Sequence, residues 1–310
     1  VDLDVGTGCG RRVALRDDSC CSWWHLSHPA TRSLALGQTI SVLITGTGVF
    51  SSLLAADGIS LPVFQCSLNY VLLAGHLFWV ARSCRQDGLT FPWWRYGLWA
   101  LTDVQANYLV VMAYRYTSVA SVMLLDCFTI PCVMVFSHLA IRACYTKGHV
   151  LSCLVCIFGL MLTVVSDSLF KSSESGGLEP PLSKPWLGDL LVLAGAVLYA
   201  FSNVQQELIL KAGTSRFEAL GMLGLWGSAI SCIQAGLLEG QEVAQITWSL
   251  QSVLCLLGFQ LCLFGMYVLT SVFLVSADAA LFNLSLLTSD VYSVLFSYIV
   301  QHQRFGWTYA

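Results

Sequence analysis

Charged side chains are scarce in this sequence: Asp, Glu, Lys and Arg together make up only 11% of its 310 residues. A soluble domain carries roughly 25%, so this chain has too few polar groups to cover a water-soluble particle of its size. The scarcity of charge excludes a soluble enzyme and a disordered chain. The formal net charge of −3 also excludes a nucleic-acid binder, because phosphate backbones are bound by basic surfaces.

Motifs of catalysis and cofactor binding are missing as well. The sequence contains no HExxH, no GxSxG and no Walker phosphate loop, the patterns that hold zinc, a nucleophilic serine and a nucleotide. Cys153 and Cys156 form a CxxC pair, but it lies inside an apolar stretch rather than in the polar turn that suits a zinc or redox pair. We therefore expect no enzymatic activity, no cofactor and no metal.

Long apolar runs are what the sequence has instead, since 56% of its residues are apolar. A bilayer core needs about 20 apolar residues per helix. With that window the sequence predicts nine membrane spans, at residues 35–56, 63–81, 95–114, 117–142, 149–168, 186–208, 218–238, 250–275 and 278–300. The expected fold class is an all-α polytopic membrane protein embedded in a lipid bilayer.

Polar segments divide the chain. Residues 1–34 are predicted to be a disordered cytoplasmic tail, because they hold several Arg residues but no apolar core of a signal peptide. Residues 169–185 are rich in Ser, Gly and Pro and are predicted to form a hydrophilic loop. The loop separates a five-helix half at 35–168 from a shorter half at 186–310. Residues 306–310 resemble the start of a tenth helix, so we expect the last span to be missing.

Basic residues are distributed unevenly over the predicted loops. If the N-terminus is cytoplasmic and the spans alternate, most Lys and Arg residues lie on the cytoplasmic side, where the positive-inside rule places them. The exceptions are Arg115, Lys171, Lys184 and Arg304. We therefore predict a cytoplasmic N-terminus. Residues 269–276, after the eighth span, lack the basic residue expected beside a cytoplasmic turn.

Polar residues recur at helical spacing inside four of the spans. An Asp at the centre of a membrane helix costs at least about 2.5 kcal/mol on insertion scales, and residues spaced by three or four share a helix face. These side chains are therefore predicted to line one shared polar cavity. The predicted cavity residues are Asp103, Asn107, Tyr108, Tyr114, Asp126, Tyr199, Asn203, Asn283 and Asp290.

Several of these polar residues have more than one interpretation. Ser285, Thr288 and Thr129 are interpreted as hydrogen-bonding groups between helices. Asp126 and Asp290 are candidates for solute binding or for carrying a coupling proton. Glu207 lies nearer a helix end, where it is either a solvated cap residue or a third coupling carboxylate. Trp99 and Tyr108 are either anchoring aromatics or rings that stack on a planar solute.

The sign of the intramembrane charges constrains the solute. The ionisable groups in the spans are acidic, and the only basic candidate, Arg115, lies at the end of a span. A doubly charged phosphate would require Arg or Lys side chains. The residues therefore favour a small neutral or cationic organic solute that forms hydrogen bonds. A carboxyl group in such a site can also carry a coupling proton.

Four stretches of the sequence resemble solute carrier family 35, subfamily F. They lie at residues 101–118, 121–131, 188–204 and 283–293, in the same order and spacing as in that family. The resemblance implies the drug/metabolite transporter (EamA-like) fold, with ten helices in two inverted five-helix repeats around a central cavity. It also implies a membrane of the Golgi, the endoplasmic reticulum or the cell surface.

The resemblance and the charges together suggest a function. The wider family is known for nucleotide-sugar antiporters, but the shortage of basic residues in the spans favours a nucleobase- or nucleoside-like solute. The leading hypothesis is a secondary-active transporter that works by alternating access, with or without formation of a homo-oligomer. The alternatives are a non-transporting truncated isoform, a membrane interaction partner of a full-length carrier, and a seven-span receptor with an extracellular N-terminus.

Overall fold

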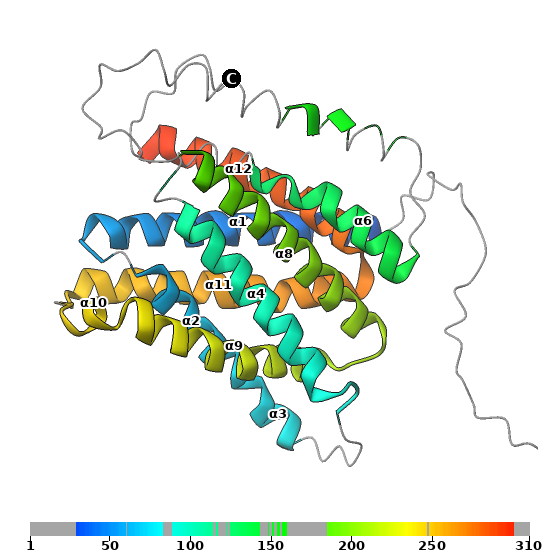
Figure 1. Cartoon of the computed structure of the whole chain (residues 1–310), viewed down its shortest axis with the longest axis horizontal. Coiled ribbons are helices and arrows are strands. Elements are labelled where there is room, and N and C mark those ends of the chain that lie inside the picture. Colours follow the sequence, from blue (N-terminus) through cyan, green and yellow to red (C-terminus); the bar gives the residue numbers. More distant parts are fainter. Residues whose placement is uncertain are drawn as a thin grey trace, which may run out of the picture.

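The computed structural model of the chain describes a bundle of helices (Figure 1). It describes residues 29–59, 61–82, 89–113, 116, 122, 125–142, 148, 151, 154–155, 157–159, 185–246 and 248–300. The side chains of residues 29–32, 52, 55–56, 141, 185, 290–291 and 293–300 lie outside this description. The predicted tail at 1–34, the loop at 169–185 and the start of a tenth helix at 306–310 fall largely or wholly outside the described residues.

Every regular element in the described part of the chain is a helix. The helices are α1 (Pro29–Ala56), α2 (Pro62–Ala74), α3 (His76–Arg82), α4 (Trp93–Ala113), α6 (Thr129–Ile141), α8 (Pro185–Lys211), α9 (Arg216–Leu238), α10 (Gly240–Ala244), α11 (Leu250–Ser276) and α12 (Ala279–Val300). Five of the described helical segments are long and apolar enough to cross a membrane. The chain is therefore an all-helical, polytopic membrane protein.

Most of the predicted spans coincide with these helices. The bounds of α1, α4, α8, α9, α11 and α12 agree with the predicted spans to within a few residues. The predicted span 63–81 is interrupted at Gly75, which separates α2 from α3. In the predicted span 117–142, the long described helix begins only at Thr129, after a turn at residues 127–128. Most of the predicted span 149–168 lies outside the described residues.

The helices pack in a reciprocal pattern. Helix α1 lies against α11 and α12, α8 lies against α4 and α6, and α2 lies against α9 (Figure 1). These pairs remain the same when α1 is exchanged with α8, α2 with α9, α4 with α11, and α6 with α12. The ends of α1 and α8 match too, because each is followed by a glycine with positive φ, Gly58 at +83° and Gly213 at +91°. Glycine adopts this conformation at little cost and so commonly ends a helix.

Helices α2 and α9 approach each other closely along a row of glycines. A Cβ atom on Gly224 would lie 2.1 Å from the backbone nitrogen of Ala74, and one on Gly227 would lie 2.6 Å from the ring of Tyr70. Small residues in membrane helices allow backbones to approach in this way. The glycine row therefore fixes the antiparallel α2–α9 pair and holds the Tyr70 ring against α9.

We expect the α2–α9 contact to be intolerant of added volume. Gly224→Ala places a methyl group against backbone atoms that cannot rotate away, and overpacking of this kind costs about 1–3 kcal/mol. The measurement is thermal unfolding of the purified protein in detergent. Gly236→Ala is the matched control, because it lies on the same helix with nothing within 4 Å of the added Cβ. Equal unfolding temperatures for the two variants would contradict the close packing described here.

Candidate functional site

The carboxylate of Asp103 lies at the centre of the bundle and is 6% exposed. The hydroxyls of Tyr70 and Tyr267 donate hydrogen bonds to its Oδ2 atom at 2.6 and 2.7 Å, and the hydroxyl of Ser202 donates to Oδ1 at 2.9 Å. These donors come from α2, α11 and α8, while Asp103 belongs to α4. One carboxylate therefore connects four helices that are far apart in the sequence.

Further hydrogen bonds extend from this carboxylate along α4. The indole nitrogen of Trp99 donates to Ser202 Oγ at 3.1 Å. The amide nitrogen of Asn107 donates to the Tyr70 hydroxyl at 3.2 Å, and its Oδ1 accepts from the Tyr199 hydroxyl at 2.9 Å. We call this set the Asp103 network; it consists of Tyr70, Trp99, Asp103, Asn107, Tyr199, Ser202 and Tyr267.

The Asp103 network suits a negatively charged carboxylate. Each of its three hydroxyl partners donates to the carboxylate, and hydrogen bonds to an ionised acceptor are the strong ones. In the described part of the chain no Lys, Arg or His side chain lies within ion-pair distance of Asp103. The charge is thus stabilised by neutral dipoles alone. Because Oδ1 accepts only one of these hydrogen bonds, it keeps a lone pair that a proton or a cationic group can use.

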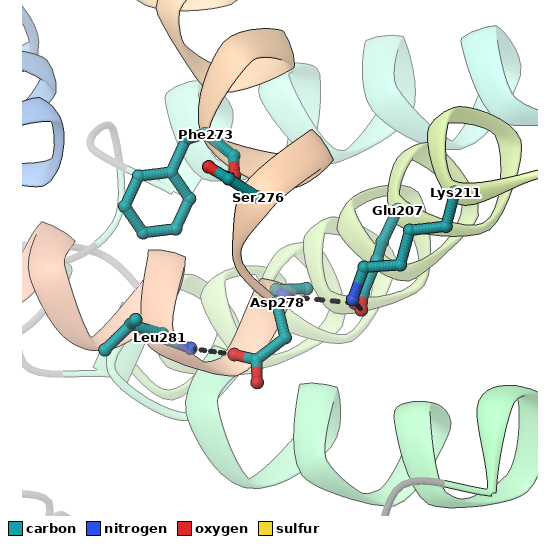
Figure 2. Close-up of polar contacts among 7 residues, drawn as sticks. Glu207, Lys211, Phe273, Ser276, Asp278 and Leu281 are labelled. Carbon is teal, nitrogen blue, oxygen red and sulfur yellow. Dashed lines mark hydrogen bonds and ion pairs between the residues drawn. The ribbon is translucent and has the colours of Figure 1, made fainter. Parts of the chain in front are cut away.

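The start of α12 is held by carboxylates from two directions (Figure 2). Glu207, 2% exposed, accepts a hydrogen bond from the backbone nitrogen of Ala279 at 3.0 Å and forms an ion pair with Lys211 at 2.6 Å. Asp278 accepts a hydrogen bond from the backbone nitrogen of Leu281 at 2.8 Å. Such acceptors pair with the free N–H groups of the first helical turn, and their negative charge interacts favourably with the positive end of the helix dipole.

Glu207 is therefore a cap residue, but a buried one that caps a neighbouring helix rather than a solvated one. The sequence lacks a basic residue at 269–276, but Lys211 supplies one from another helix. Its ion pair with Glu207 brings a positive charge from α8 to the turn between α11 and α12. One helix turn from Glu207, the Nδ2 atom of Asn203 donates to Asn283 Oδ1 at 3.2 Å. Two predicted residues on α8 thus contact α12.

The hydrogen-bonding residues of the sequence analysis have different roles. Thr288 donates to Ser41 Oγ on α1 at 2.9 Å and so forms an interhelical bond as predicted. The Ser285 hydroxyl donates within its own helix, to the carbonyl of Leu281. Thr129 Oγ1 is buried without a hydrogen-bond partner among the described residues.

Other predicted cavity residues lie apart from the Asp103 network or outside the description. Asp126 is half-buried and lies just before the turn at residues 127–128. Tyr114 lies outside the described residues, as does the side chain of Asp290. Trp99 is 1% exposed and bonded to Ser202, so its ring is covered by protein in this conformation. Tyr108 lines a cavity of about 10 Å³ beside the network, which is roughly the room that one water molecule needs.

Sequence reasoning missed three members of the network: Tyr70, Ser202 and Tyr267. Ser202 lies three residues after Tyr199, so its position on the same helix face was available from the spacing. Tyr70 and Tyr267 carry no comparable signal. Each lies in an apolar span with no aligned acid, and only the packing of α2 and α11 brings their hydroxyls to Asp103.

The family model for solute carrier family 35, SLC35F, matches residues 27–310 of the chain. The chain is 38% identical to "Solute carrier family 35 member F2" of Mus musculus over 286 residues, which are 90% of this chain and 74% of that protein. It is 36% identical to the protein of the same name in Xenopus tropicalis over 285 residues, 89% of this chain and 72% of that protein.

More distant comparisons agree. An uncharacterized solute carrier family 35 member of Schizosaccharomyces pombe is 32% identical over 282 residues, which are 88% of this chain and 54% of that protein. One crystal structure superposes with a TM-score of 0.65 at 16% identity, covering 89% of this chain and 91% of that chain; it shows the shared fold alone. The chain belongs to solute carrier family 35, subfamily F, as its sequence motifs predicted, and this is a family of transporters.

Loss of the Glu207 cap is expected to destabilise the junction of α8 and α12. Glu207→Gln keeps the size of the side chain but removes the charge that pairs with Lys211, and a hydrogen bond to a charged group contributes about 1.5–3 kcal/mol. Thermal unfolding in detergent measures the loss. Glu242→Gln on α10 is the control, because Glu242 is exposed. The cap assignment is wrong if both variants unfold at the wild-type temperature.

Proposed function

We propose that this chain is a secondary-active solute transporter that works by alternating access, with the Asp103 network on its solute pathway. The observation that carries the proposal is the buried carboxylate of Asp103, which is held by hydroxyls from α2, α8 and α11 and has no basic partner among the described residues. Ionisable groups inside membrane helices are costly and usually mark a pathway for a solute or an ion.

The reciprocal packing supports a duplicated architecture. The exchange of α1, α2, α4 and α6 with α8, α9, α11 and α12 maps the most extensive helix pairs onto one another, as expected for the two inverted repeats of an EamA-like fold. Helices α4 and α8 are antiparallel, since Trp99 and Asn107 contact Ser202 and Tyr199 in reverse order. That direction supports an even number of crossings between them, which the predicted spans 117–142 and 149–168 would supply.

The network crosses the boundary between the two proposed repeats. Tyr70 and Asp103 belong to the first, and Ser202 and Tyr267 belong to the second. In transporters of this kind, one repeat rocks against the other around a site near the bilayer midplane. Such a movement would break the hydrogen bonds from Ser202 and Tyr267 to Asp103. The solute or a proton would then replace the lost donors, which couples binding to the movement.

The chemistry of the network favours an uncharged or cationic solute. The site offers a carboxylate, hydroxyls and the amide of Asn107, and these groups bind hydrogen-bond donors and cations better than phosphates. A nucleobase- or nucleoside-like molecule fits this description better than a nucleotide sugar. We also propose that the N-terminus is cytoplasmic. The membrane that holds the protein is that of the Golgi, the endoplasmic reticulum or the cell surface.

Removing the charge at the centre of the network is expected to abolish transport. Asp103→Asn should reduce uptake to the background of untransfected cells, because a neutral amide cannot accept three hydroxyl donors with comparable strength. The assay is uptake of radiolabelled adenine, guanine, uracil, adenosine, guanosine and uridine by cells that express the chain. Expression at the same membrane level, measured by immunoblot, separates transport from folding.

Two further variants control this experiment. Tyr267→Phe removes one of the three donors and should lower uptake less than Asp103→Asn, whereas Glu242→Gln on the exposed α10 should leave uptake unchanged. Wild-type uptake by Asp103→Asn would overturn the role of the network. Absence of uptake for every solute, with a correctly inserted chain that co-purifies with a longer family member, would instead favour a non-transporting partner.

Asp126 and Asp290 stay the predicted coupling carboxylates, and Glu207 is better explained as a cap. If either Asp carries the coupling proton, its Asn variant should lose the stimulation of uptake by an imposed pH gradient, while exchange of solute without a gradient persists. The measurement compares net uptake with exchange in reconstituted vesicles. Full stimulation in both Asp126→Asn and Asp290→Asn would contradict these assignments.

A further inference from the structure

A small cavity beside the Asp103 network lies between α2, α4 and α9. We call it the Cys66 pocket and define it by six of its lining residues: Cys66, Tyr70, Asn107, Tyr108, Ser231 and Gln234. Tyr70 and Asn107 are also members of the Asp103 network. The pocket and the network are therefore continuous, and a molecule that fills the pocket touches the groups that hold the carboxylate in place.

The α9 wall of the pocket carries polar atoms without hydrogen-bond partners. Among the described residues, Ser231 Oγ and Gln234 Oε1 are buried and make no hydrogen bond, and Ser231 is 1% exposed. Leaving such a group unpaired costs about 1–3 kcal/mol. Both side chains line the pocket. A ligand that brings a donor to Gln234, and a donor or an acceptor to Ser231, would recover this free energy.

The remaining walls specify an uncharged, partly flat ligand. No Asp, Glu, Lys or Arg is among the residues that line the pocket in the described structure. The rings of Tyr70 and Tyr108 and the methyl groups of Val104 and Val111 provide apolar surface. Phosphate and sulfate have no counter-charge here. A neutral heterocycle with hydrogen-bond groups at its edge matches both the polar and the apolar lining.

The pocket is too small for a heterocycle in this conformation, and the contacts around it indicate how it widens. Its volume of about 10 Å³ holds roughly one water molecule. Helices α2 and α9 are tied together at one end, because Glu239 at the end of α9 accepts hydrogen bonds from the backbone nitrogens of Val63 and Phe64 at 3.0 and 2.7 Å. The glycine row ties the same two helices further along. The movable wall is therefore α4.

Helix α4 is itself fixed to α9 at its start. The Tyr96 hydroxyl donates to Glu218 at 2.8 Å, and the rings of Trp93 and Trp226 stack with centroids 5.6 Å apart. A swing of α4 about this end would widen the pocket near Asn107. That swing stretches the hydrogen bonds that Tyr70 forms with Asp103 and Asn107. Opening of the pocket and release of the network are thus one movement.

From this geometry we infer that the Cys66 pocket is the subsite that binds the heterocyclic part of the transported solute. The inference rests on the proposed transport function but can fail separately from it. Gln234 and Ser231 bind the edge of the ring, Tyr108 lies against the ring, and insertion of the ring parts α4 from the α2–α9 pair. The solute thereby releases the Tyr70 hydroxyl from Asp103 and starts the change of conformation.

The test compares two cysteines, Cys66 on α2 and Cys232 on α9. Cys66 lines the pocket, whereas Cys232 is exposed on α9, so one reports on the pocket and the other on the outer surface. The purified full chain in detergent is alkylated with N-ethylmaleimide, and the rate at each cysteine is followed by peptide mass spectrometry. The probes are adenine, guanine, cytosine, uracil, adenosine and uridine, each added separately.

We expect at least one probe to slow alkylation of Cys66 and to leave Cys232 unchanged. At about ten times its dissociation constant, a ligand that covers the thiol slows the reaction about tenfold, since the unoccupied fraction falls as 1/(1 + [L]/Kd). Gln234→Leu and Ser231→Ala should weaken this protection. Ser228→Ala, one turn away on α9, should not, because Ser228 is only half-buried and does not line the pocket. No protection by any probe, or equal slowing at both cysteines, overturns the inference.

Two more readouts separate the inference from its alternatives. If the pocket merely holds a structural water, Gln234→Leu should lower the unfolding temperature and leave probe protection intact, which contradicts a solute subsite. If it is a subsite, the variant should be at least as stable as wild type, because it removes an unpaired buried group. A probe that is transported by cells without protecting Cys66 refutes the subsite alone. A probe that protects Cys66 without being transported refutes the transport proposal alone.

Discussion

A carboxylate buried among membrane helices must be given hydrogen-bond donors, and in this protein that requirement concerns Asp103. Three hydroxyls meet it, and each comes from a different helix. Because all three donors are neutral and the carboxylate is held by geometry alone, small rotations of any one helix change how well the charge is stabilised. The centre of the bundle is thus sensitive to helix position in a way that a purely apolar core is not.

The placement of those donors depends on contacts some distance away. The Tyr70 hydroxyl reaches Asp103 because its ring rests against Gly227 of α9, where a larger residue would collide with the ring. The Ser202 hydroxyl is held by Trp99, which contributes both a hydrogen bond and a large buried surface between α4 and α8. Residues that do not touch the carboxylate themselves therefore decide whether the site forms.

The sequence predicted the helices better than the contacts between them. Long apolar runs determine where helices form in a membrane protein, so most of the predicted spans coincide with described helices. The spacing of Asp103 and Asn107 predicted that they share a helix face, and both belong to the Asp103 network with Tyr199. The break at Gly75 was missed, because it lies inside a continuous apolar stretch and leaves no signal in the hydropathy. Tyr70 and Tyr267 were missed for a similar reason, since a single hydroxyl in an apolar span becomes significant only when another helix brings an acid to it.

The ion pair of Glu207 and Lys211 has a consequence for how the protein is synthesised. The first turn of α12 is capped by a residue that precedes it by 72 positions, so Glu207 enters the membrane long before the N–H group it binds exists. Its other partner, Lys211, is four residues later in the same helix. The two charges can therefore enter the bilayer as one neutral pair, which keeps α8 insertable until α12 leaves the ribosome and completes the junction.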